Sequence, residues 1–208
     1  MPYTSYADLA HEQIEGIDYQ RSWRESAVSS LAHLAIHGGG IEQGSSELAE
    51  AAAGGIHDLY VFDGMKAANN AELHLTSTLF DEPHALAIAR TATHTVSWHG
   101  ASGTAPLTHL GGLDYVLRDR IGLALSRAGF AVQIAGPELA GTDPANICNR
   151  NTRKAGVQLE LSTGQRQAFF AGGDMSRPNR VHRTPAFTTY VQAVQQALAH
   201  SLVEDRVG

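Results

Sequence analysis

Short apolar runs typical of buried strands alternate with amphipathic segments along this 208-residue chain, and this alternation limits the folds that it can adopt. The predicted strands cover residues 28–36, 59–62, 94–99, 130–135 and 157–161, with further extended segments at 19–23 and 73–78. The predicted helices cover residues 6–14, 47–53, 83–88, 113–128 and 185–202. Strands that alternate with helices favour a mixed, largely parallel sheet between helical layers. We therefore predict an α/β fold, a three-layer α/β/α sandwich in which residues 1–208 form a single domain.

Composition excludes several classes of protein. Hydrophobic residues make up 43% of the chain and charged residues 17%, which suits a globular core and excludes a disordered or coiled-coil chain. No apolar run approaches the roughly 18 residues that cross a membrane, so we expect no membrane partner. The first residues lack a basic start and an apolar run, so we expect no secretion signal and a cytoplasmic location.

Charge is unevenly distributed along the chain. The net charge of −6 argues against a nucleic-acid partner. Between residues 150 and 183, however, seven lysines and arginines accompany only two acidic residues. This basic region suits a site that attracts an anionic ligand, and it suits equally a solvated loop whose arginines pair with acids elsewhere.

Polar side chains stand where three of the predicted strands end. His37 follows the strand at 28–36, and the next three residues are glycines that let the chain turn, so that Glu42 can fold back toward His37. His99 ends the strand at 94–99, and Glu160 lies near the end of the apolar strand at 157–161. Because open α/β sheets bind ligands at the carboxyl ends of their strands, we expect these four side chains to meet there.

Two imidazoles and one carboxylate are the ligand set of a catalytic zinc site, and a further glutamate nearby can accept a proton from the attacking water. We therefore predict Zn²⁺ held by His37, Glu42 and His99, with Glu160 as the general base. Taken singly, each residue has an ordinary explanation. A lone histidine at a strand end is more often structural, and a buried glutamate is as often a salt-bridge partner. The combination favours the metal site.

These motifs, with several others in the same order, resemble the poly-gamma-glutamate hydrolase family, whose members include bacteriophage enzymes that cut the gamma-glutamyl capsule polymer. The motifs are His37-Gly38-Gly39-Gly40-Ile41-Glu42, Ser46-Glu47-Leu48-Ala49, Leu73-His74-Leu75-Thr76-Ser77-Thr78, His99-Gly100, Gly111-Gly112-Leu113-Asp114, Asn146-Ile147-Cys148-Asn149-Arg150 and Gly156-Val157-Gln158-Leu159-Glu160-Leu161. The resemblance implies a zinc carboxypeptidase-like fold, zinc held by His37, Glu42 and His99, and Glu160 as the base.

The resemblance also implies contacts with substrate. It makes Arg150, with Asn149 beside it, a candidate to grip a substrate carboxylate with two hydrogen bonds and so assist catalysis. His74 is a candidate for the wall of the cleft, although a residue in an alternating segment more often supports its neighbours. The His-x4-Glu spacing is longer than the His-x2-Glu of the digestive carboxypeptidases, so Glu47 remains a second, less favoured ligand.

We therefore predict a zinc-dependent amidohydrolase that uses a metal-activated water to cleave gamma-glutamyl amide bonds in poly-gamma-glutamate. One alternative is a zinc peptidase or deacylase on small N-acyl or peptide amides. Another is a non-catalytic, phage-derived binding module, which the acidic net charge disfavours. The expected partner is an anionic gamma-glutamyl polymer or another carboxylate-bearing amide, and the expected state is a monomer. A phage-encoded enzyme of this kind could also be released by host lysis.

Overall fold

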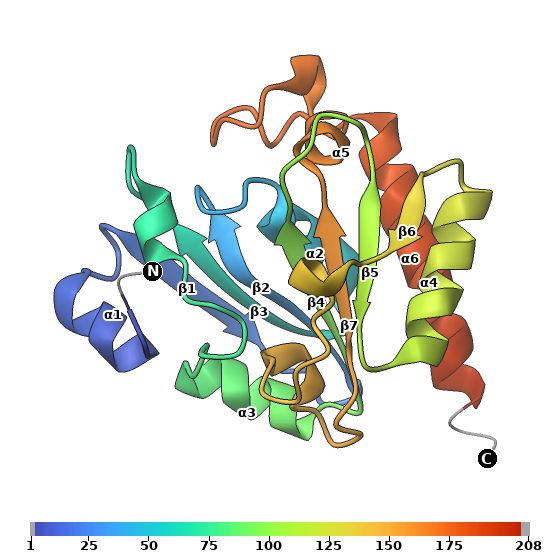
Figure 1. The fold of residues 1–208 in the computed structure, drawn as a ribbon, viewed down its shortest axis with the longest axis horizontal. Helices are drawn as coiled ribbons and strands as arrows, with labels where there is room; N and C mark the ends of the chain where they lie inside the picture. The colour runs from blue at the N-terminus through green and yellow to red at the C-terminus, as the bar shows by residue number, and fades with distance from the viewer. Residues whose placement is uncertain (1–2, 205–208) are drawn as a thin grey trace.

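The computed structural model describes residues 3–204, with side chains as far as residue 199, and its centre is a seven-stranded sheet (Figure 1). The strands are β1 (Tyr19–Arg24), β2 (Leu31–Gly39), β3 (Asp58–Gly64), β4 (His94–Gly100), β5 (Thr108–Gly112), β6 (Val132–Ile134) and β7 (Val157–Leu161). They lie in the order β1-β3-β2-β4-β7-β5-β6. The pairs β3/β2, β2/β4, β4/β7 and β5/β6 are parallel, whereas β1/β3 and β5/β7 are antiparallel. The predicted mixed, largely parallel sheet is confirmed.

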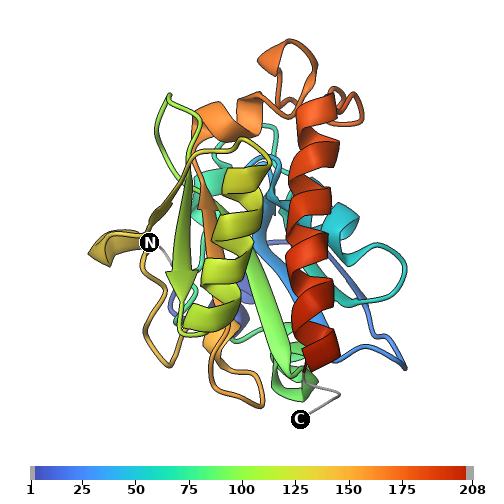
Figure 2. The same cartoon turned by 90° about the vertical axis from the view of Figure 1, so that its right-hand side faces the viewer.

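Strand residues alternate between two hydrophobic clusters, one on each face of the sheet. In β2, Ala35 belongs to the first cluster with Trp98 of β4, while Leu34 and Ile36 belong to the second. The first cluster includes residues of α2 (Ser45–Ala53), α4 (Tyr115–Arg127) and α6 (Pro185–Glu204), and the second those of α1 (Tyr6–Glu12) and α3 (Pro83–Thr91). Figure 2 shows α4 and α6 side by side over the sheet. The predicted α/β/α layering is confirmed.

Local capping explains where two helices begin. Glu82 accepts a hydrogen bond from the backbone N–H of Ala85 (2.8 Å), and Pro83 occupies the first turn of α3. Asp114 accepts one from the backbone N–H of Leu117 (3.1 Å) at the start of α4. The start of α3 is the predicted one, and α4 begins at Tyr115, two residues later than predicted.

The short helix α5 (Thr163–Gln167) was not predicted, and two further segments differ from the expected strands. Residues 73–78 do not form a strand. A 3-10 helix (Asn70–Leu73) ends in the buried Leu73 and leads into a loop that buries Leu75. The alternation of this segment therefore reflects burial and not strand pairing. Strand β5 was not predicted, because Gly111 and Gly112 are typical of a turn. Gly112 adopts a φ of +92°, and a Cβ there would lie 2.1 Å from a backbone oxygen of Gly156, so close pairing with β7 requires glycine.

None of the helices within residues 3–204 is both long and apolar enough to span a membrane.

One buried histidine makes the fold sensitive to acid. His33 of β2 is fully buried, its Nδ1 accepts a hydrogen bond from Trp98 Nε1 (3.1 Å), and its Nε2 has no partner among the described residues. Burial, reinforced by the positive charge of nearby His57 and Arg24, lowers the pKa of His33 to about 3. Because the unfolded chain binds this proton below about pH 6.5, the stability that neutral His33 contributes is present above that pH and is lost as the pH falls toward 3.

We expect His33→Asn to flatten this dependence, because Asn keeps an acceptor near the Nδ1 position but does not titrate. The free energy of unfolding in urea should fall by about 2 kcal/mol less between pH 7 and pH 5 than in the unsubstituted protein. Equal losses in the two proteins would show that His33 is not the responsible group.

Candidate metal centre

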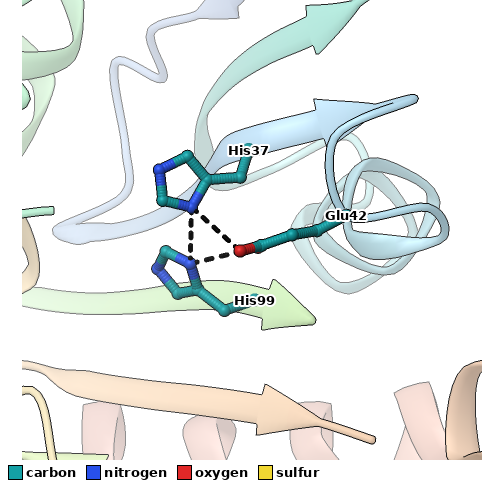
Figure 3. A group of neighbouring side chains, drawn as sticks. All are labelled: His37, Glu42 and His99. Carbon is teal, nitrogen blue, oxygen red and sulfur yellow. Dashed lines mark hydrogen bonds and ion pairs between the residues drawn. The ribbon is translucent and has the colours of Figure 1, made fainter. Parts of the chain in front are cut away.

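Three side chains from separate segments converge at the carboxyl end of the parallel strands (Figure 3). His37 projects from β2, His99 from β4, and Glu42 from the turn between β2 and α2. His37 Nδ1 lies 3.1 Å from His99 Nδ1 and 3.2 Å from Glu42 Oε1, and His99 Nδ1 lies 3.3 Å from Glu42 Oε2. A tetrahedral zinc ion with bonds of about 2.0–2.2 Å needs ligand atoms roughly 3.3–3.5 Å apart. The three donors therefore stand close to the spacing that such an ion requires.

The turn after β2 brings Glu42 back beneath His37. The backbone N–H of Glu42 donates to the carbonyl of His37 (2.8 Å), and Gly39 adopts a φ of +63°. A Cβ at Gly39 would lie 2.5 Å from the carbonyl oxygen of Gly64, so a side chain there would push the turn away from β3. The glycines are needed for the backbone path that returns Glu42 to the cluster.

Hydrogen bonds on the far side of each imidazole fix its orientation. His37 Nε2 lies 2.8 Å from the carbonyl oxygen of Leu75, which only accepts, so Nε2 carries the proton and the Nδ1 lone pair faces the cluster. His99 Nε2 lies 2.7 Å from the hydroxyl of Ser97. Partners of this kind are typical of metal-binding histidines, whose rings they orient.

The electrostatics of the cluster favour a carboxylate in contact with two imidazoles. Burial opposes the charge on Glu42, but the adjacent His37 and His99 outweigh it and hold the Glu42 pKa well below its usual range. Burial lowers the pKa of His37. For His99, burial acts in the same direction but is outweighed by Glu42 and Glu160, which raise its pKa. Protonation and metal binding compete for His99, so the affinity of a metal for this site is linked to pH.

Glu160 lies on β7 beside the cluster. It is the register partner of His99 on the neighbouring parallel strand, and it is 7% exposed. Gln158 Nε2 donates to Glu160 Oε1 (3.0 Å), and Asn146 Nδ2 in turn donates to Gln158 Oε1 (2.8 Å). Burial raises the pKa of Glu160 to about 7. A carboxyl group with that pKa can both accept and return a proton near neutral pH.

The four side chains open into a cavity of about 560 Å³. Its other walls carry hydroxyl and amide groups, contributed by Thr76, Ser77, Thr78, Ser102, Thr142, Asn146 and Gln158. Glu138 and Asp143 add two further carboxylates, and no lysine or arginine is among the lining residues. Most of these walls come from loops without a periodic pattern, so the sequence does not identify them as wall residues. Gln158 is the exception, because strand alternation places it on the same face as Glu160.

His74 lies in the cavity wall, as predicted for a cleft residue. Its ring stacks on that of His37 with centroids 3.8 Å apart, and its Nε2 lies 3.5 Å from Glu42 Oε1. This position allows a role toward substrate as well as support of the cluster.

Asn149 and Arg150, in contrast, do not line the cavity. The Asn149 amide is used internally: it donates to the carbonyls of Gly141 and Asp143 and accepts from the backbone N–H of Gly156. Arg150 donates to the carbonyls of Ala145 and Thr78. Both side chains brace the loops of the wall, so these contacts do not support the predicted grip on a substrate carboxylate.

The alternative ligand Glu47 is engaged elsewhere. It lies on α2, and its Oε1 accepts a hydrogen bond from Arg180 Nε (2.6 Å). It is therefore Glu42, and not Glu47, that joins His37 and His99.

The basic region at 150–183 is also dispersed. Arg153 pairs with Asp114 (2.7 Å), Arg180 pairs with Glu47, and Arg183 lies over the ring of Phe187. None of its seven lysines and arginines lines the cavity. The structure therefore fits the interpretation that these side chains are engaged elsewhere better than the interpretation that they attract an anionic ligand.

Comparison with known proteins identifies the family to which this chain belongs. The sequence profile of the poly-gamma-glutamate hydrolase family matches residues 3–193. The chain belongs to the poly-gamma-glutamate hydrolase family. Among the proteins similar to it is the UPF0714 protein YmaC of Bacillus subtilis (strain 168), 35% identical over 94% of this chain and 83% of that protein. The SPbeta prophage-derived protein YoqZ of the same strain is 41% identical over 66% of this chain and 50% of its own length.

Two solved structures share the fold nearly end to end. A bacteriophage poly-gamma-glutamate hydrolase matches with a TM-score of 0.93 and 36% identity, over 97% of this chain and 98% of the other. The zinc-free apo form of YndL matches with a TM-score of 0.89 and 32% identity, over 96% of this chain and 98% of the other. The expected resemblance to this hydrolase family is confirmed.

If the cluster holds zinc, zinc should stabilise the fold. At a free concentration of one hundred times its dissociation constant, zinc should raise the free energy of unfolding by about 2.7 kcal/mol. Glu42→Gln should remove most of this rise, because it removes the charged ligand. The measurement is urea unfolding with and without zinc.

Glu47→Gln is the matched control, because Glu47 is a nearby carboxylate on α2 that is not part of the cluster. It should retain the zinc-dependent rise. An equal rise in Glu42→Gln and the unsubstituted protein would place the metal elsewhere.

Proposed function

We propose that this member of the family is a zinc-dependent amidohydrolase that cleaves gamma-glutamyl amide bonds in poly-gamma-glutamate. One observation carries the proposal: the His37–Glu42–His99 cluster and Glu160 share one cavity at the carboxyl edge of the sheet. Family membership and the likeness to a bacteriophage poly-gamma-glutamate hydrolase support the substrate class. The existence of a form of YndL described as zinc-free supports the identity of the metal.

The residues present suit zinc by their chemistry. Two imidazole nitrogens and a carboxylate oxygen form its three-ligand catalytic set, and His37 presents an unprotonated Nδ1 to the cluster. When bound, zinc would lower the pKa of a coordinated water and polarise the amide carbonyl.

The remaining steps fall to side chains of this chain. The Glu160 carboxylate accepts the proton of the attacking water, and its pKa of about 7 lets it return that proton to the departing amine. Gln158 holds Glu160 by its Oε1, which keeps the carboxylate beside the cluster. His74 and the hydroxyl groups of the wall are placed to hold the substrate amide and its carboxylates through hydrogen bonds.

One observation favours a second candidate. The cavity wall carries Glu138 and Asp143 and no lysine or arginine, so it attracts a polyanion less than the sequence suggested. This electrostatic character suits a zinc peptidase or deacylase on small N-acyl or peptide amides. The monomeric state and the location in the cell stay predictions.

Replacing Glu160 with Gln tests the proposal. The variant should bind zinc as the unsubstituted protein does, because no ligand changes, but kcat should fall by about 10²–10⁴-fold because the base is lost. The measurements are zinc stoichiometry and the size distribution of poly-gamma-glutamate during digestion. A near-unchanged rate would show that Glu160 is not the base.

The same assay with a small N-acyl glutamate amide separates the two candidates. Faster turnover of gamma-glutamyl oligomers supports poly-gamma-glutamate as substrate. Turnover confined to the small amide would favour the second candidate as the function, and the proposed role of the metal would be unchanged.

A further inference from the structure

A buried arginine lies just behind the candidate metal centre and outside its cavity. Arg166 belongs to the short helix α5 (Thr163–Gln167) that follows β7, and it is 7% exposed. Its guanidinium donates to three backbone carbonyls: Nε to Leu161 (3.1 Å), Nη1 to Gln43 (2.8 Å) and Nη2 to Ala101 (3.1 Å). Nη2 also lies 3.4 Å from the hydroxyl of Thr163.

The three carbonyls belong to the three segments that carry the site. Gln43 directly follows the ligand Glu42, Ala101 lies two residues after the ligand His99, and Leu161 directly follows Glu160. One planar group therefore joins the turn after β2, the end of β4 and the end of β7. A guanidinium suits this task because its donors point outward in a fixed plane, whereas an ammonium group holds its partners less rigidly.

Gly100 leaves room for this arrangement. A Cβ at that position would lie 2.5 Å from the Cζ of Arg166, so the guanidinium packs directly against the backbone of β4. The backbone N–H of Gly100 donates to Glu42 Oε2 (2.9 Å). The same residue thus contacts a candidate ligand through its N–H and Arg166 through its bare Cα.

The hydrogen-bonding partners of Arg166 are unusual for a buried cation. Within the described part of the chain its bonds go to neutral oxygens, and it forms no salt bridge. Arg180, which is 6% exposed, pairs with the carboxylate of Glu47. Burial of a charge is costly, and the nearby carboxylates of Glu42 and Glu160 oppose that cost for Arg166, which links this arginine to the site.

We infer that Arg166 is the positioning residue of the metal centre: it fixes Glu42, His99 and Glu160 relative to one another by holding the backbone next to each. The inference rests on the proposed function, since it assumes that these residues act together on one metal ion. Arg166 lies outside the cavity, and its hydrogen bonds go to backbone carbonyls and a hydroxyl group rather than to the ligand atoms.

The test uses the full chain with Arg166→Lys, which keeps the charge but not the planar fork. Zinc affinity, measured by chelator competition, should fall by about 10- to 100-fold, the usual cost of losing a group that orients metal ligands. The absorption spectrum of the Co²⁺-loaded protein should change as well, because it reports the geometry of the ligands. Gly100→Ala is a second variant, since its methyl group displaces the guanidinium while every donor and acceptor remains.

Arg180→Lys is the matched control, because it alters an equally buried arginine that joins α2 to the segment before α6. It should change the midpoint of unfolding but leave zinc affinity and the Co²⁺ spectrum unchanged. Unchanged affinity and spectrum in both Arg166→Lys and Gly100→Ala would overturn the role of Arg166. If the unsubstituted protein binds no zinc, the proposed metal centre fails, and the role of Arg166 fails with it.

Discussion

The parallel pairing of β2, β4 and β7 is the constraint on which the rest of this structure depends. Strands that run in the same direction end at the same edge of a sheet, so His37, His99 and Glu160 meet there although they are far apart in sequence. Glu42 is not on a strand and reaches the edge only because the glycine turn after β2 reverses the chain. The site is therefore a product of topology together with one tight turn.

Because Glu42 is buried in the cluster, its negative charge must be balanced there. A buried carboxylate is unfavourable unless a cation faces it. In the described structure the carboxylate faces His99, whose pKa it raises, and it also lies against His37, so that the three groups present their donor atoms to a common point. This arrangement holds Glu42 ionised and so prepared as a ligand. For Glu160, burial outweighs the opposing influence of His99 and raises the pKa, and the two carboxylates thereby acquire different roles.

Residues on regular elements were predictable from the sequence, and residues that depend on loops were not. Strand alternation and the glycine run located His37, Glu42, His99 and Glu160, because each stands at or just after a strand end. The role of residues 149–150 could not be judged in this way, since it depends on which carbonyls the surrounding loops present. Nor does any local pattern distinguish Arg166 from a solvated arginine, because its partners come from segments up to 123 residues away.

We propose that one zinc ion binds at the Nδ1 atoms of His37 and His99 and at a Glu42 carboxylate oxygen. Anomalous diffraction at the zinc edge, from crystals of the zinc-loaded protein, tests it most directly. We expect a single strong peak about 2.0–2.2 Å from each of these three atoms. A zinc peak next to Nε2 of either histidine, or one located away from Glu42, would contradict this proposal.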